Sequence, residues 1–206
     1  SRESGFISFV GAAAPVVLFA CATASLDLVR DVIRSNALIV QAEEAVSVLS
    51  DHFGPRGEGG LAVIGSDWCE PAMLDLESKF VEGGLAPVTL HDSKDFSHGR
   101  FQSLSLEPVL SQAVLTLRTG QETYYEHILS RVLRKEVGDL RVVELAAATT
   151  ESLGMLEMLL AVQNFSVKIG TQRGIDISKP KKIARNWLQL YRWDSPLVGG
   201  IDAPEN

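Results

Sequence analysis

The sequence predicts an α/β fold in which a mostly parallel sheet is covered by helices on both faces. Short apolar runs rich in β-branched residues alternate with segments that carry apolar residues at helical spacing. Such alternation is typical of strands joined by helical crossovers, which makes the strands parallel. The chain has 206 residues, which suits one domain with a sizeable core, and 46% hydrophobic with 22% charged residues is ordinary for a globular protein.

The N-terminal quarter of the chain predicts helices. Residues 9–21 form an apolar run that is too short to span a bilayer and that we expect to be a core helix. The run also resembles the core of a signal peptide, although Pro15 interrupts it. Residues 27–53 predict two helices broken near Ser35 and Asn36, and residues 54–60 have the composition of a linker.

Residues 61–101 are the stretch in which chemistry can be argued. Leu61 to Ile64 has the length and branching of a buried strand, and Gly65-Ser66-Asp67 then turns the chain. Pro71 to Glu82 predicts a helix, since proline suits the first helical turn and two glycines follow Glu82. Another strand, residues 87–90, leads into a polar loop. Further along the chain, the pattern predicts strands at 113–117 and 140–145 and helices at 122–134 and from 151 to about 165.

The helix from Pro71 to Glu82 has a charged side formed by Asp75, Lys79 and Glu82. The negative end of the helix dipole disfavours the charge of Glu82, whereas the ammonium of Lys79 favours it. That balance suits a group that transfers protons. The alternative is an ordinary solvated Lys and Glu on a helix surface.

These residues resemble a pattern of the sugar isomerase (SIS) family, most closely that of the isomerase domain of glucosamine-6-phosphate synthases. In the family a strand ends in glycine, a helix carries K-x-x-E, and an H-G pair follows in a loop. Gly65, Lys79-Phe80-Val81-Glu82 and His98-Gly99 occur here in that order. Near the end of the chain, Asp176, Pro180 and the run KKIAR resemble the closing D-x-D-x-P-x-N-L-A-K segment, with Ser178, Lys182 and Arg185 at the positions that differ.

The resemblance implies an aldose-ketose isomerase of sugar phosphates that works through an enediolate. Glu82 would move the proton between C1 and C2, and His98 would assist ring opening. Lys79 and Arg185 would stabilise charge, although Arg185 cannot readily lose a proton. Ser8, Gly65 and Ser66 are candidate contacts to the sugar. Because the family's histidine often comes from the neighbouring subunit, the resemblance also implies a homodimer with the site at the subunit interface.

The resemblance implies a flavodoxin-like three-layer sandwich, the SIS fold, and it covers only the second of the family's two halves. We therefore expect residues 1–55 to be a helical segment leading from a missing first half, and residues 56–206 to be the C-terminal SIS domain. The family's phosphate clamp belongs to the other half. The alternative to an isomerase is a non-catalytic module that binds a sugar phosphate or nucleates assembly, with the chemistry in a fused or partner domain. A purely structural half-domain is a third possibility.

Composition excludes some classes of function. The net charge of -7 and the pI near 5.1 argue against a nucleic-acid surface. Two cysteines without metal-ligand spacing indicate a reduced, cytoplasmic setting, and the scattered histidines predict no metal; the isomerisation needs no cofactor. A rival phosphate site could form where Thr149 and Thr150 precede a helix, although capping is the more ordinary role of such threonines. His91 and Asp92 could line the same cleft as His98.

Overall fold

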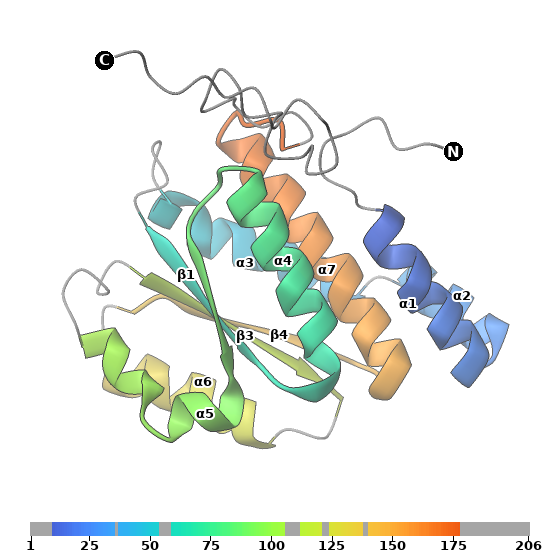
Figure 1. Ribbon diagram of the computed structural model, residues 1–206, viewed down its shortest axis with the longest axis horizontal. Coiled ribbons are helices and arrows are strands. Elements are labelled where there is room, and N and C mark those ends of the chain that lie inside the picture. Colours follow the sequence, from blue (N-terminus) through green and yellow to red (C-terminus); the bar gives the residue numbers. More distant parts are fainter. Residues whose placement is uncertain are drawn as a thin grey trace, which may run out of the picture.

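The structure, a computed structural model, confirms the predicted α/β class (Figure 1). It describes residues 10–35, 37–53, 59–105, 112–120, 124–137 and 140–177. The strands are β1 (Gly60–Gly65), β2 (Val88–Asp92), β3 (Gln112–Thr119) and β4 (Val142–Ala147). The α-helices are α1 (Val10–Thr23), α2 (Leu26–Ser35), α3 (Ala37–Leu49), α4 (Glu70–Glu82), α5 (Ser93–Ser97), α6 (Tyr124–Glu136) and α7 (Glu151–Gln172). Short 3₁₀ helices are formed by Ser50–Phe53, Asp67–Cys69 and Arg100–Ser105.

The four strands form one parallel sheet in the order β2-β1-β3-β4. Val63 of β1 lies opposite Leu90 of β2 and Leu115 of β3, so β1 is an inner strand. Every residue of β1 is buried, which explains its uninterrupted apolar sequence, because both faces of a parallel sheet are covered.

Helices cover the two faces of the sheet and make three layers (Figure 1). Helices α3, α4 and α7 pack on the face to which Leu61 and Val63 point, and this face holds the larger core. Helices α5 and α6 cover the opposite face, to which Ala62 and Ile64 point. Helices α4 and α5 are therefore separated by the sheet, and this separation decides which site residues can meet.

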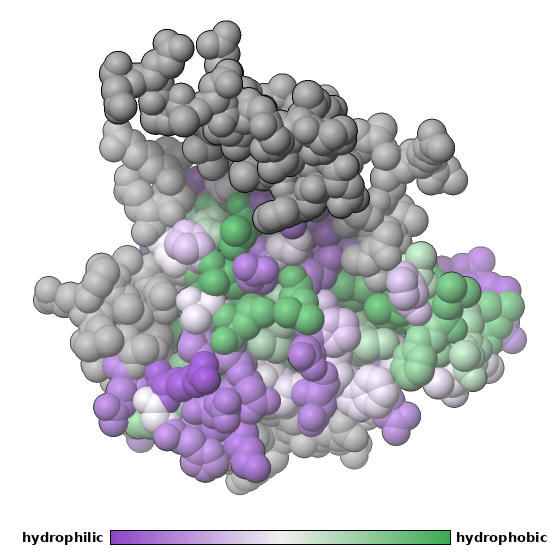
Figure 2. All heavy atoms as spheres, viewed as in Figure 1, coloured by the Kyte–Doolittle hydropathy of each residue, from purple (hydrophilic) through white to green (hydrophobic). Residues whose placement is uncertain are grey.

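The N-terminal helices agree with the predicted pattern. Helix α2 ends at Ser35 and α3 begins at Ala37, as the expected break requires. Helix α1 packs against α7 through the fully buried Ala20, whereas Leu18 is 70% exposed and Figure 2 shows hydrophobic residues gathered over this part of the surface. Among the residues that the structure describes, no helix has the length and apolar character needed to cross a membrane.

The structure corrects two expectations about the elements. The polar loop predicted after residue 90 contains the short helix α5, because the Asp92 carboxylate accepts hydrogen bonds from the backbone N–H groups of Lys94 and Asp95 and caps it. Helix α7 continues to Gln172, beyond the predicted end near Phe165, because its buried face continues through Ile169.

Candidate functional site

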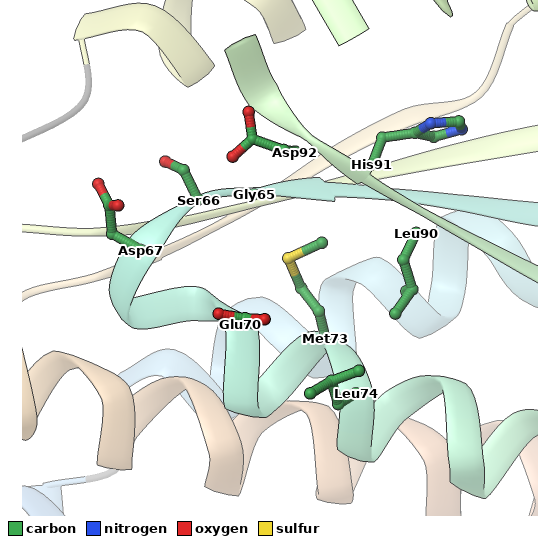
Figure 3. Close-up of a pocket in the computed structure, with 9 residues that line it drawn as sticks. All are labelled: Gly65, Ser66, Asp67, Glu70, Met73, Leu74, Leu90, His91 and Asp92. Carbon is green, nitrogen blue, oxygen red and sulfur yellow. The ribbon is translucent and has the colours of Figure 1, made fainter. Parts of the chain in front are cut away.

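A pocket lies at the carboxyl ends of β1 and β2, where open α/β sheets bind their ligands. Its volume is about 260 Å³. Strand order reverses between β1 and β3, so the segment that leaves β1 lies beside the switch point of the sheet. Figure 3 shows the lining residues, which are Gly65, Ser66, Asp67, Glu70, Met73, Leu74, Leu90, His91 and Asp92.

The turn after β1 places Gly65 and Ser66 at this pocket. A Cβ on Gly65 would lie 3.0 Å from the Met73 sulfur and 3.1 Å from the Cys69 Cβ, so glycine allows α4 to start close to the strand. Asp67 has a φ of 46°, a left-handed conformation that aspartate tolerates better than most residues. Gly65 and Ser66, which are two of the three predicted sugar contacts, therefore line this pocket.

The pocket is acidic. Asp67, Glu70 and Asp92 are exposed and line it, and none of its lining residues is a lysine or an arginine. The Asp92 carboxylate is engaged in capping α5, at 2.9 Å from the Lys94 nitrogen and 3.1 Å from the Asp95 nitrogen. Asp67 and Glu70 make no side-chain hydrogen bond or ion pair with the described part of the chain. A phosphate would meet like charges here.

His91 lies at the pocket but directs its ring away from the other lining side chains (Figure 3). The ring packs against Phe96 of α5 at 5.2 Å between centroids, and its Nδ1 atom is buried without a hydrogen-bond partner in the described part of the chain. Burial, assisted by the positive charge of Arg100, lowers the pKa of His91 below its ordinary value. His91 therefore favours the neutral form near pH 7. The structure confirms that His91 and Asp92 line a cleft, but His98 is not among the lining residues.

Lys79 is buried and is not the solvated lysine of the alternative interpretation. Its side chain is 3% exposed, and its ammonium donates to the Asp75 carboxylate at 2.8 Å. The second carboxylate oxygen of Asp75 is buried without a hydrogen-bond partner in the described part of the chain. The pair lies on the buried side of α4, and the Lys79 ammonium is the counter-ion of the Asp75 carboxylate.

Glu82 is exposed at the last residue of α4 and accepts a hydrogen bond from the Ser78 hydroxyl at 3.0 Å. It stands twelve positions after Glu70, and at 1.5 Å per residue this places it about 18 Å from the start of the helix. Glu82 therefore lies at the opposite end of α4 from the pocket that Gly65 and Ser66 line.

His98 is exposed and follows α5 as its C-terminal cap, with Gly99 at a φ of 137°. Helix α5 covers the opposite face of the sheet from α4. The structure thus does not bring His98 and Glu82 together within one chain. Ser8 and Arg185, the remaining predicted site residues, lie outside the described residues, as do Pro180 and the run KKIAR.

The rival site before α7 is occupied by the protein itself. The Glu157 carboxylate accepts hydrogen bonds from the Ala148 N–H at 2.8 Å and from the Thr149 hydroxyl at 2.9 Å. Thr150 stands at the N-cap position in an extended conformation, but its side chain makes no capping hydrogen bond. The Glu157 carboxylate thus takes two of the donors that an anion at this turn would use, and its negative charge opposes a phosphate there.

A partly buried carboxylate, Glu144 of β4, faces α6. It accepts hydrogen bonds from Arg118 and, at 2.7 Å, from the Ser130 hydroxyl, and His127 lies 3.5 Å away. Burial alone would raise the pKa of Glu144, but the hydrogen bonds from Arg118 and Ser130 outweigh it and hold the pKa below the ordinary value. This network ties the edge strand to α6. Within the described residues, no three His, Cys, Asp or Glu side chains form a group suited to hold a metal ion.

Sequence reasoning did not single out Glu70 and did not predict that Lys79 is buried. Glu70 could have been found from its position one turn after the end of β1, next to the Pro71 that starts the helix. The spacing of Asp75 and Lys79 at i and i+4 signals a pair, but it does not tell whether the pair faces water or the core.

Comparisons with known proteins find solved structures with a similar fold. No protein-family model matches the sequence, and no curated protein shows significant similarity to it. Among solved structures, the chain resembles a provisionally assigned phosphosugar isomerase involved in capsule formation from Bacteroides fragilis, at 13% identity and a TM-score of 0.54. That match covers 75% of this chain and 94% of the other.

A second similar structure is a provisionally assigned phosphosugar isomerase from Clostridium difficile, at 17% identity and a TM-score of 0.58. The match covers 80% of this chain and 48% of that one, so the chain spans about half the length of the Clostridium protein. The class defined by these findings is an α/β protein with the fold of phosphosugar isomerases. Activity does not follow from identities this low.

Proposed function

We propose that the chain is a SIS-type unit that acts on a sugar phosphate and interconverts aldose and ketose through an enediolate. The observation that carries this proposal is the parallel α/β fold shared with the two phosphosugar isomerase structures. Glu82 is the base that moves the proton between C1 and C2, since it is an exposed carboxylate and its only described hydrogen bond comes from a surface serine.

The proposed site is shared between two chains. Glu82 ends α4 and His98 directly follows α5, and these two helices cover opposite faces of the sheet, so the proposed site takes the two residues from different copies. A homodimer in which Glu82 of one protomer faces His98 of the other joins a proton-transferring carboxylate to a group that can assist ring opening.

Lys79 serves the site indirectly in this proposal. Its ammonium is held by Asp75 inside the helix packing, so Lys79 positions the end of α4 on which Glu82 stands. Gly65 and Ser66 are left out of the proposed sugar site, because their pocket lies at the other end of the helix. Arg185 and Ser8 remain candidate contacts.

The separation of Glu82 from the strand-end pocket also favours a second candidate, a module that binds a sugar phosphate without catalysis. The two differ in their response to Glu82→Gln, which keeps the size of the side chain and removes its basicity. An isomerase loses turnover and keeps binding, whereas a binding module has no turnover to lose.

The test follows loss of the C1 or C2 proton by NMR when the protein is incubated in D₂O with hexose, pentose and heptose phosphates. We expect exchange with at least one sugar phosphate and its loss in Glu82→Gln. Glu44→Gln is the matched control, since Glu44 is an exposed carboxylate on α3 and has no proposed role. Ligand-induced shifts without any proton exchange would contradict the isomerase and support the binding module.

A further inference from the structure

We propose that the pocket at the carboxyl ends of β1 and β2 binds a small organic cation, an ammonium or guanidinium group carried on a short apolar chain. This site is separate from the proposed phosphosugar site, because Glu82 stands eight positions, or about 12 Å along α4, beyond Leu74, the last residue of the helix that lines the pocket. The proposal rests on the shape of the cavity, on the charges at its rim and on the side chains of its floor.

Negative charge dominates the rim. Three carboxylates line the pocket, and two of them, Asp67 and Glu70, have no side-chain partner in the described part of the chain. The N-terminus of α4 contributes about half a positive charge, and the start of α5 is already matched by Asp92. The balance remains negative, so a cation is attracted and a phosphate is repelled.

The floor of the pocket is apolar. Met73, Leu74 and Leu90 lie on one side of the cavity, and Figure 3 shows the carboxylates of Asp67 and Glu70 displaced from Leu74 and Leu90 toward the start of α4. A ligand with a charged head and a hydrocarbon stem matches this division. The volume of about 260 Å³ is below the usual range for drug-sized ligands, so the pocket suits a small ligand with a short stem.

Other charged groups nearby do not reverse this preference. His91 favours the neutral form near pH 7, since burial lowers its pKa. Arg100 is exposed and lies 3.9 Å from the Asp95 carboxylate, which offsets its charge. A cation that enters the pocket therefore meets two unpaired carboxylates and no competing ammonium from the lining residues.

Methionine NMR gives a direct measurement. The chain has three methionines, of which Met73 lines the pocket while Met155 and Met158 are buried in α7 and serve as internal controls. Protein labelled with ¹³C at the methionine methyl groups is titrated with butylammonium, agmatine, the neutral analogue butan-1-ol and inorganic phosphate. We expect the Met73 signal alone to shift and saturate with the two cations, more weakly at high salt.

Variants decide whether the carboxylates cause the binding. Asp67→Asn keeps a residue that tolerates the left-handed backbone, and Glu70→Gln keeps the shape of the helix start. Each is expected to weaken binding of the cations about three- to tenfold, as for loss of a charge-assisted contact. Asp31→Asn, an exposed carboxylate on α2, should change nothing.

The outcomes separate the alternatives. Equal shifts with butan-1-ol, or unchanged affinity in both carboxylate variants, would reduce the pocket to an apolar void and overturn the proposal, as would a Met73 shift produced by phosphate. Tighter binding of Nα-acetyl-lysinamide than of butylammonium would support the site and assign the cation to a protein side chain; the reverse order would support a free amine. None of these results depends on isomerase activity, so the two proposals can fail separately.

Discussion

In the proposed isomerase, Glu82 and His98 act on one sugar from two different chains, and subunit complementation tests this arrangement. The helices that carry them cover opposite faces of the sheet. Glu82→Gln and His98→Ala should therefore each lose isomerase activity as pure proteins. Mixing the two variants under conditions that exchange subunits should restore part of it.

The size of the recovery follows from the symmetry of a dimer with two shared sites. Random exchange of equal amounts makes half of the dimers mixed, and each mixed dimer has one site with both native residues and one site with neither. Recovery should therefore approach about 25% of the native activity per total protein, as expected for two-fold symmetric sites.

The assay is proton exchange in D₂O with the best sugar phosphate, before and after the variants are mixed. A mixture of Glu82→Gln with Glu82→Ala, which has no intact partner for any site, is the matched control and should stay inactive. Absence of recovery, with subunit exchange verified by mass spectrometry of the mixed dimer, would refute the shared site. A monomeric protein that keeps full activity would refute it as well.

Three further predictions concern stability. Lys79→Ala leaves the Asp75 carboxylate buried and uncompensated and should lower the free energy of unfolding by about 3–5 kcal/mol, whereas Asp75→Leu combined with Lys79→Met should restore most of it; urea unfolding measures both. The folded-state pKa of His91 lies below its unfolded value, so stability should fall as the pH drops below about 6.5 and level off below the folded pKa. His91→Leu should flatten that dependence in urea titrations between pH 7.5 and 5, whereas His98→Asn, at an exposed position, should keep it. A Cβ on Gly154 would lie 2.5 Å from the Thr149 carbonyl oxygen, so Gly154→Ala should cost about 1–3 kcal/mol in thermal or urea unfolding, and a neutral result would show that α7 can shift.

The α/β class was predictable because apolar residues recur at a different spacing in the strands than in the helices. The β1 sequence is apolar at every position, and helix α2 has the contrasting amphipathic pattern, so the α/β class could be inferred without tertiary information. The strand order and the faces on which the helices lie depend on long-range packing, and the local pattern does not contain them. The expected separation between residues 1–55 and 56–206 stays a prediction, although α3 packs against α7.

Helix α5 shows a local signal that could have been used. Asp92 is followed by residues whose N–H groups it caps, and aspartate is among the preferred N-cap residues. The same preference for Thr150 was misleading, because Thr150 stands at the N-cap position of α7 but its side chain makes no capping hydrogen bond. The hydrogen bonds that Glu157 accepts from Ala148 and Thr149 join residues eight and nine apart, and a short sequence window does not reveal them.

The K-x-x-E element illustrates why a motif does not fix the role of each residue in it. Positions three apart on a helix are neighbours, yet the buried side of α4 ends between them, so Lys79 lies within the core packing and Glu82 faces solvent. The Asp75 carboxylate lies four residues earlier in the helix and pairs with the Lys79 ammonium. This ion pair replaces hydration by water and lets the lysine be buried. If the chain is an isomerase, the lysine therefore acts through the helix on which the base stands, and its loss should lower stability before it alters the chemistry at Glu82.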